Sequence, residues 1–442
     1  MPDPDGEYGA VETHKKDELV VALPDLKLVQ DALRHLHVDI KTTDPDERLG
    51  LALLTLDGIG PASAGLKNQD PKLEQSLIDA KWPKGQPKGI ELSDLDVILD
   101  RLRKYFGGEY SGWVPEMGKN RMIAPVRGFP YVSGCAQGDP RQILANPRCT
   151  NGAPQGWQTR PTEPGHGVLV GLLDTQLYPN HWLAGGYLAS QNDLLEGPGP
   201  GGEPPKALAG HGTFIAGLIL HRAPGARLVV RAVMKQDAVG PTWEVAKAMA
   251  QFVGTETDIL NLSFGCYTDD GQPPLVLAKA VSLVSPQILL VAAAGNHGNI
   301  QQLREEDSEL AAAAPWMAYI TNTTPVWPAA FSEVTAVGAT DAPFSPRVPW
   351  VDVTAPGQNV ESTYLDGPVK LESAKASDLE SSTASDPPTQ FNGFACWEGT
   401  SFAAASVSGA VAAMIGPGRD ARQALQAVLA DRDSGIQRFQ LT

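Results

Sequence analysis

The sequence has 442 residues, of which 42% are hydrophobic and 19% charged, and its formal net charge is −16 at pH 7. A chain of this length exceeds the size at which one core usually stops growing, so we expect two domains or one elaborated domain. The acidic balance argues against binding to nucleic acid or to an anionic membrane surface. The sequence contains no apolar run of 18 residues, so we expect no transmembrane helix.

The N-terminus and the cysteines indicate the cellular compartment of the protein. Residues 1–17 are charged and contain no apolar segment of a secretory signal. The four cysteines are too few for a disulfide framework, and their spacing fits no zinc site, although the first two are close enough in sequence to pair: Cys135, Cys149, Cys266 and Cys396. We therefore expect a reduced, cytoplasmic protein with no catalytic metal.

The first hundred residues predict a small α+β module. Its expected elements are a strand at Leu19–Leu23, a helix at Asp25–Val38, a strand at Leu49–Leu56 and a helix at Ser93–Tyr105 that Ser93 could cap. A polar stretch, Pro61–Gly89, connects the second strand to the second helix. We assign residues 1–105 to this module and residues 106–140, which are rich in Gly, Pro and Arg, to a linker or extended segment.

Beyond Gly167, short apolar runs alternate with helical stretches, and this alternation predicts a mostly parallel central sheet covered by helices on both faces. Residues 141–442 form this α/β domain. The expected elements are Val168–Leu173, Thr213–His221, Leu228–Val233, Thr242–Phe252, Ile259–Ser263, Leu275–Val284, Ile288–Ala293, Val334–Ala339 and Val351–Thr354. Three stretches are expected to be surface insertions: Glu196–Pro205, Gln301–Ala314 and Ser373–Gln390.

A Gly-Thr-Ser triplet at Gly399–Ser401 opens a helix that is apolar on all sides, which predicts burial in a large core. Unpaired N–H groups and the positive end of the helix dipole would stabilise negative charge beside Ser401. A serine nucleophile needs a positioned base. The alternative is a simple helix cap.

His211 lies between two glycines at the start of an apolar helix, and Asp174 ends a buried strand. A rigidly placed histidine and an acid that fixes its tautomer are what a serine nucleophile requires. Asn296 follows a buried strand and a glycine, and its amide could donate to an oxyanion. Taken singly, these residues are also typical of a cap, a strand end and a turn.

Together these stretches resemble the subtilisin-like serine peptidases (subtilases) over residues 140–442. The motifs occur in the family's order of Asp, His, Asn and Ser: Asp174-Thr175-Gln176, Gly210-His211-Gly212-Thr213 through Gly217, Ala293-Ala294-Gly295-Asn296 and Gly399-Thr400-Ser401. Gln176 departs from the family's usual Gly, Ala405 from its Pro and Ser406 from its His.

The resemblance implies a subtilisin-like three-layer fold and a serine endopeptidase that acts on peptides or proteins. It assigns Asp174, His211 and Ser401 to the catalytic triad and Asn296 to the oxyanion hole. The wall of the pocket for the residue before the scissile bond would be Ser263, Phe264 and Gly265 on one side and Ala293, Ala294 and Gly295 on the other. No cofactor is required for the chemistry, and structural calcium remains open.

Three readings stay open from the sequence. The chain is a general endopeptidase, a maturation protease or transpeptidase dedicated to one partner peptide, or an inactive fold of this family that binds peptides. The family is often made with an N-terminal propeptide, and the strand–helix–strand pattern of residues 1–105 is compatible with one. The alternative is a permanent accessory domain. We expect this module to pack on the catalytic domain.

Overall fold

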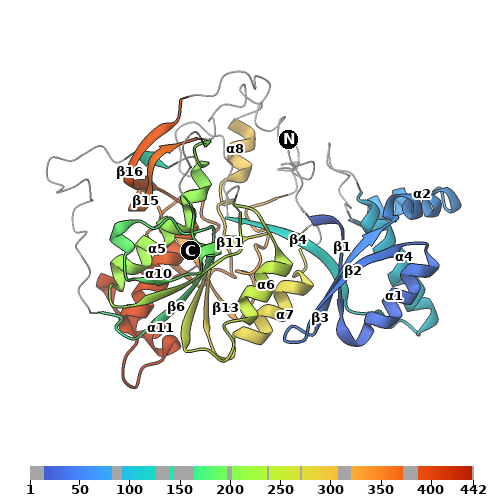
Figure 1. Ribbon diagram of the computed structural model, residues 1–442, viewed down its shortest axis with the longest axis horizontal. Coiled ribbons are helices and arrows are strands. Elements are labelled where there is room, and N and C mark those ends of the chain that lie inside the picture. The colour runs from blue at the N-terminus through green and yellow to red at the C-terminus, as the bar shows by residue number, and fades with distance from the viewer. Residues whose placement is uncertain are drawn as a thin grey trace.

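The computed structural model describes residues 14–81, 92–125, 140–142, 164–196, 202–235, 238–268, 271–306, 320–371 and 387–440. Within these residues, an eight-stranded sheet in the order β17-β14-β13-β12-β10-β6-β8-β7 forms the centre of the larger part (Figure 1). The strands are β6 (Leu169–Asp174), β7 (Tyr187–Leu188), β8 (Arg227–Ala232), β10 (Thr257–Leu262), β12 (Leu289–Ala293), β13 (Val334–Ala339), β14 (Val353–Ala355) and β17 (Gln437–Arg438). All neighbours pair in parallel except β14 and β17.

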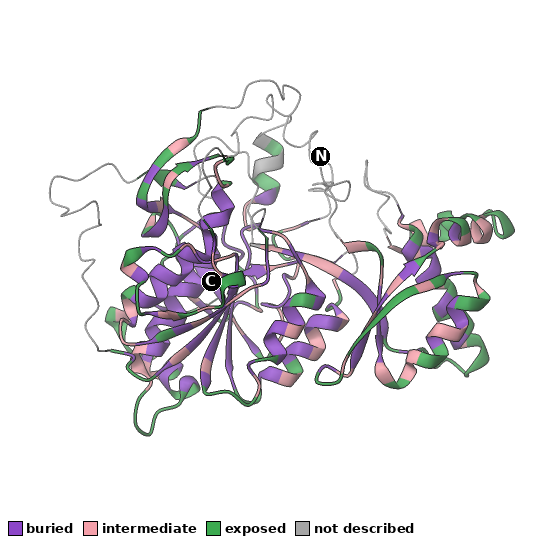
Figure 2. Ribbon diagram, in the orientation of Figure 1, coloured by how far each residue is buried: buried purple, intermediate pink, exposed green. Residues whose placement is uncertain are grey.

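Helices cover both faces of this sheet. One face packs against α5 (His211–Arg222), α10 (Thr400–Met414) and α11 (Ala421–Ala430), and the other against α6 (Thr242–Ala250) and α7 (Leu275–Val284). Strands enclosed in this way have no solvent face, and every residue of β12 is buried. Figure 2 shows the burial continuing through the central strands. The predicted three-layer α/β fold is confirmed.

The helix that begins with the Gly-Thr-Ser triplet lies inside the core, as its composition predicts. Residues 400–412 of α10 are all buried. The N-cap residue is Gly399, and Thr400 and Ser401 are the first two residues of α10 and not its N-cap. Two further helices, predicted at Leu275–Val284 and Thr242–Phe252, correspond to α7 and α6, although α6 ends at Ala250.

The N-terminal part has its own antiparallel sheet, in the order β4-β1-β3-β2. Its elements are β1 (His14–Ala22), α1 (Leu26–His35), β2 (Asp39–Asp46), β3 (Leu51–Asp57), α2 (Ile59–Gln69), α3 (Leu73–Lys81), α4 (Asp94–Glu109) and β4 (Met117–Pro125). Leu19 and Val21 pack with its helices, whereas Val20 and Ala22 face the larger part. The alternation of side chains along β1 therefore builds two cores at once.

Three features of this part differ from the sequence-based description. The boundary at residue 105 falls inside α4, where Phe106 is buried. The expected linker contains β4, which pairs with β1 in the sheet. The Pro61–Gly89 connection holds nearly all of α2 and the whole of α3, and residues 82–91 lie outside the described residues. The prediction that Ser93 caps a helix is confirmed, because Ser93 and Asp96 form a reciprocal capping box at α4.

The N-terminal part packs on the larger part through its sheet. Val20, Leu51 and Ile123 share a hydrophobic core with α6 and α7. Strand β4 continues beyond this core and pairs with β9 (Gly240–Pro241) and β11 (Phe264–Gly265) of the larger part (Figure 1). The expectation that the N-terminal module packs on the catalytic domain agrees with these contacts.

A hairpin of β15 (Val360–Val369) and β16 (Thr389–Trp397) lies beside α5, and β5 (Arg141–Gln142) pairs with β16. Ser362 Oγ and Thr363 Oγ1 donate to the carbonyls of Phe214 and Thr213 at 2.7 and 2.8 Å, which fixes the hairpin on the helix. The insertion expected at Ser373–Gln390 therefore ends inside β16, and its residues 373–386 lie outside the described residues. The insertion expected at Gln301–Ala314 begins inside α8 (Ile300–Glu306).

The cysteines and the membrane prediction can be compared only in part. Cys396 is a free thiol and Cys266 is buried, whereas Cys135 and Cys149 lie outside the described residues. In the part of the chain that the structure describes, no helix has both the length and the apolar character needed to span a bilayer.

Candidate active site

Asp174 is the last residue of β6 and lies at the carboxyl edge of the parallel sheet, where open α/β sheets place functional groups. It is completely buried, and its Oδ1 accepts the N–H of Thr175 at 2.8 Å. The Gln176 side chain, at the position where the family usually has glycine, donates to the carbonyls of Asn192 and Leu194. These bonds tie the turn after Asp174 to a neighbouring segment.

His211 is the first residue of α5, and its Nδ1 lies 2.7 Å from Asp174 Oδ1. When Nδ1 carries the proton and donates it to this carboxylate, Nε2 is free to accept another. Gly212 must be glycine, because a Cβ there would lie 2.7 Å from the carbonyl oxygen of Thr175. The Gly212 N–H also donates to Thr175 Oγ1 at 2.9 Å, which draws the start of α5 against the end of β6.

Two aromatic rings hold the imidazole of His211. The Phe402 ring lies 5.6 Å from it, and the Trp397 ring lies 5.9 Å away and nearly perpendicular to it. Phe214 packs on both rings. Packing between these two rings restricts rotation of the imidazole. The sequence analysis did not assign Trp397 or Phe402 to the site; only the position of Phe402 directly after Ser401 could have indicated it.

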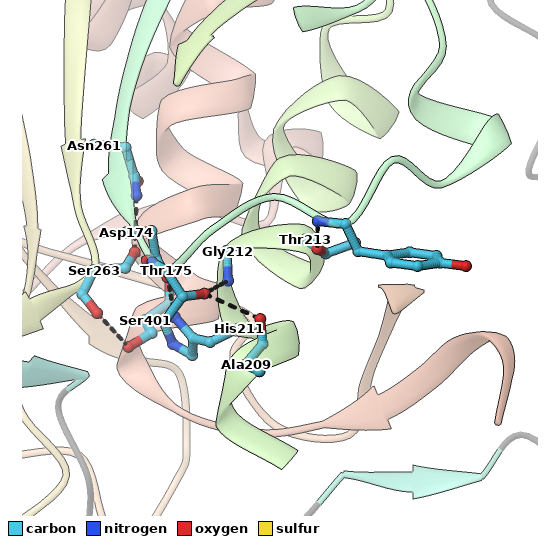
Figure 3. A network of polar contacts seen from close by, with 10 residues as sticks. Asp174, Thr175, Ala209, His211, Gly212, Thr213, Asn261, Ser263 and Ser401 are labelled. Atoms are coloured by element: carbon cyan, nitrogen blue, oxygen red, sulfur yellow. Dashed lines mark hydrogen bonds and ion pairs between the residues drawn. The ribbon is translucent and has the colours of Figure 1, made fainter. Parts of the chain in front are cut away.

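Ser401 is the second residue of α10 and lies beside His211 and Asp174 in Figure 3. Its Oγ donates to the carbonyl of Ser263 at 3.0 Å, and Ser263 Oγ donates to the carbonyl of Ser401 at 2.9 Å. Asn261 holds Ser263 by donating to its Oγ at 2.9 Å. Among the described residues, no hydrogen bond joins Ser401 to His211, so the hydroxyl must turn for the imidazole to accept its proton.

Asn296 is fixed by the start of α10. Its Oδ1 accepts the N–H of Thr400 at 2.9 Å and the Thr400 hydroxyl at 3.0 Å. A backbone N–H can only donate, so this contact identifies the amide oxygen and sets the orientation of the amide. The Nδ2 group lies 3.3 Å from where a Cβ on residue 399 would be. A glycine at 399 therefore leaves room beside the amide donor and Ser401.

The two predicted walls of the substrate pocket differ in their surroundings in the structure. Ser263 borders Ser401, and the next two residues, Phe264 and Gly265, pair with β4. On the other wall, the side chains of Ala293 and Ala294 are fully buried, and Gly295 has φ of +111° and donates its N–H to Thr400 Oγ1 at 3.1 Å. The part of these residues in substrate binding stays a prediction.

Three other histidines near the motifs have no contact with Asp174. His166 and His181 are exposed, whereas His297, next to Asn296, is buried against the Tyr267 ring. Burial lowers the pKa of His297 to about 4, and the backbone of Thr324 offsets this effect only partly. His297 is therefore neutral at pH 7. Among the described residues, no three His, Cys, Asp or Glu side chains gather in a group that could hold a metal.

Comparisons with known proteins find several proteases that are similar to this chain. Subtilisin BL of Lederbergia lenta is 30% identical over 219 residues, which are 45% of this chain and 67% of that protein. Minor extracellular protease Epr of Bacillus subtilis (strain 168) is 28% identical over 228 residues, 48% of this chain, and the match spans only 30% of its length. A solved lanthipeptide protease shares 24% identity, with a TM-score of 0.41 over 61% of this chain and 81% of its own.

A family model described as the subtilase family matches residues 165–429, which is more than half of the sequence. This range contains all four motif residues, Asp174, His211, Asn296 and Ser401. The chain therefore belongs to the subtilase family of serine peptidases.

Proposed function

We propose that this peptidase hydrolyses internal peptide bonds through an acyl-enzyme formed on Ser401. The contact of 2.7 Å between His211 Nδ1 and Asp174, beside the start of α10, is the observation that carries this proposal. In the proposed reaction, Ser401 Oγ attacks the substrate carbonyl while His211 Nε2 takes its proton and then gives it to the leaving amine. Water hydrolyses the acyl-enzyme by the same proton transfers in reverse order.

The proposed role of Asn296 follows from its fixed amide. The oxygen of that amide is held by Thr400, so Nδ2 is the group that can donate to the oxyanion formed during attack. Donors that are fixed before the reaction lower the barrier because they need no reorganisation when the charge develops.

A serine-reactive fluorophosphonate probe tests the catalytic proposal against a fold that only binds peptides. We expect the protein, after removal of the N-terminal module, to be labelled at one residue, and Ser401→Ala to abolish that labelling. His211→Ala should slow labelling strongly, because the nucleophile loses its base. Labelling of the Ser401→Ala variant at the same rate would show that another residue is the nucleophile.

We further propose that the N-terminal module inhibits the peptidase until it is released. Ala124 and Pro125 pair with Gly265 and Phe264, at the edge that the family resemblance assigns to substrate. Strand β4 is also held at β9, because Ile123 pairs with Gly240. A substrate strand cannot add to β11 while β4 is there.

The inhibition is tested by adding the separate module to peptidase that lacks it. The fragment must extend to Pro125, because an end at residue 120 would divide β4. We expect inhibition at micromolar concentrations or below, reversed by dilution. No inhibition by a fragment that circular dichroism shows to be folded, together with normal folding of the shortened peptidase, would favour an accessory domain.

Dedication to one partner peptide is a narrower version of this proposal. The hairpin of β15 and β16 lies beside the base, since Trp397 at its end contacts His211, and so it can restrict which substrates enter. A panel of unrelated peptides separates the two cases. Cleavage of many sequences at similar kcat/KM indicates a general endopeptidase, and cleavage of one sequence class indicates a dedicated one.

A further inference from the structure

Strand β16 has two edges, and the chain itself covers the outer one. Its inner edge pairs with β15 over its whole length. On the outer edge, Arg141 and Gln142 of β5 pair antiparallel with Cys396 and Ala395. This short strand follows the N-terminal module in the sequence but contributes nothing to the module's own sheet.

The outer edge of β16 leads directly into the candidate active site. Trp397, the next residue, packs against the imidazole of His211, and Ser401 follows four positions later in α10. On the other side of Ser401, the Ser263 carbonyl accepts its hydroxyl, and β11 begins at the next residue. The nucleophile and base therefore lie between two strand edges, β11 and β16.

The registers show in which direction the chain passes these edges. On β11, Ala124 pairs with Gly265 and Pro125 with Phe264, so β4 runs toward Ser263 and Ser401. On β16, Arg141 pairs with Cys396, so β5 runs away from Trp397. The chain thus approaches the nucleophile along one edge and departs along the other, with the polarity that a peptide cleaved at Ser401 must have.

Side chains of β5 also hold it to the hairpin. Arg141 Nη2 donates to Asn359 Oδ1 and lies 3.7 Å from Cys396 Sγ. Gln142 Nε2 donates to the carbonyl of Gln390. Both β5 residues are exposed, whereas Ala395 is fully buried. The contact is therefore an exposed strand added to a fixed edge, which a competing strand can replace.

We propose that the outer edge of β16 at Ala395–Cys396 binds the part of a peptide substrate that follows the scissile bond, by strand addition. Arg141–Gln142 occupies this edge and must leave it before a long substrate can bind. The inference rests on the proposed peptidase function and adds a second occupied subsite, separate from the one that β4 fills on β11. Occupation of this subsite by Arg141–Gln142 would slow the cleavage of long substrates even after the module is released.

A reversible disulfide tests this proposal, because Cys396 is already free and directly opposite Arg141. Opposite residues of an antiparallel pair have Cα atoms about 4.5–5.5 Å apart, which a disulfide can span. Arg141→Cys is made in a chain with Cys135→Ser and Cys149→Ser, so that Cys396 is its intended partner. The module is cut from the full chain under reducing conditions, and the disulfide is then formed with diamide.

Two substrates distinguish an effect on the subsite from an effect on the catalytic residues. One is a quenched fluorescent peptide with at least four residues after the scissile bond, and the other is a p-nitroanilide with none. In the oxidised variant, we expect kcat/KM for the long peptide to fall about 5- to 150-fold, the value of two main-chain hydrogen bonds. The p-nitroanilide should be cleaved as before, and reductant should restore the long-peptide activity.

Gln142→Cys is the matched control, because it lies opposite Ala395 and has no cysteine partner there. Unchanged cleavage of the long peptide by a variant whose disulfide mass spectrometry confirms would overturn the proposal. Failure of the disulfide to form would also overturn it, since Arg141 and Cys396 would then not be paired. Absence of fluorophosphonate labelling in the reduced, module-free protein would instead contradict the peptidase function on which the inference rests.

Discussion

Asn120 of β4 provides the sharpest test of how the N-terminal module is held. This buried side chain caps a helix of the larger part: its Oδ1 accepts the N–H of Trp243 at 2.9 Å and the hydroxyl of Thr242 at 3.1 Å, both in the first turn of α6. Pro241, the residue before α6, supplies no side-chain cap. Asn120 Nδ2 also donates to Glu18 at 2.5 Å. Asn120→Ala removes all three contacts.

The expected cost follows from these contacts. Removing an N-cap costs about 0.5–2 kcal/mol. Glu18 is half-buried, and this burial raises the pKa of its carboxyl. Loss of the Asn120 donor therefore adds a free-energy cost at pH 7. Together these give about 1–3 kcal/mol, or a 5- to 150-fold weaker association of the module. This cost weakens the docked state and not the separated one, because water hydrates the start of α6 once the module has left.

The assay adds the separate module, residues 1–125, to peptidase that lacks it, so that the two bind without a covalent link. Peptidase activity regained on serial dilution gives the dissociation constant of the module. Lys27→Ala is the control, because Lys27 is an exposed residue of α1 whose side chain contacts Asp31 of the same helix. An unchanged dissociation constant for Asn120→Ala, with the fold of the module intact by circular dichroism, would refute the capping argument.

Three further predictions concern the site and the module. Asn296→Ala should lower kcat by about 10²–10³ with little change in KM, the usual effect of losing one oxyanion donor; near-normal turnover would mean that another group supplies the hole. Gly212→Ala should lower kcat through displacement of His211, since the added Cβ would lie 2.7 Å from the Thr175 carbonyl oxygen; a crystal structure with the His211–Asp174 contact unchanged would contradict this. Burial would raise the pKa of Asp96, but Lys119 and Lys81, at 2.6 and 3.1 Å, outweigh it and hold that pKa well below its usual range. The stabilisation is then complete above about pH 4 and is lost as the pH falls further, so circular dichroism should show the module weakening below pH 4 in the wild type and less so in Asp96→Asn.

The sequence predicts the elements whose side-chain pattern matches their burial. Helix α7 and strand β13 have the predicted bounds, Leu275–Val284 and Val334–Ala339, because their apolar faces pack on the main core. Strand β2 (Asp39–Asp46) was missed because it is a polar edge strand with almost every residue exposed. Neither alternation nor an apolar run distinguishes such a strand from a loop.

Strand β4 was missed for the opposite reason, because its polar residues are buried. Lys119 points into the module and pairs with Asp96, and Asn120 points outward to α6. Both partners are distant in sequence, so no local pattern could show that these side chains lose their water. The same limit applies to Trp397, whose contact with His211 exists only because the hairpin is fixed on α5.

The buried polar side chains of β4 also indicate whether the module stays bound permanently. Buried polar pairs seldom stabilise a fixed interface more than apolar residues of the same volume would. Here the outward side of the module's sheet combines a small apolar group, including Val20, Leu51 and Ile123, with polar contacts from Asn120 and Asp44 to Trp243. After separation, water can hydrate the exposed end of α6 and the edge of β11. We infer from this balance that the interface suits a module that docks, fills the cleft and leaves, more than an accessory domain that stays.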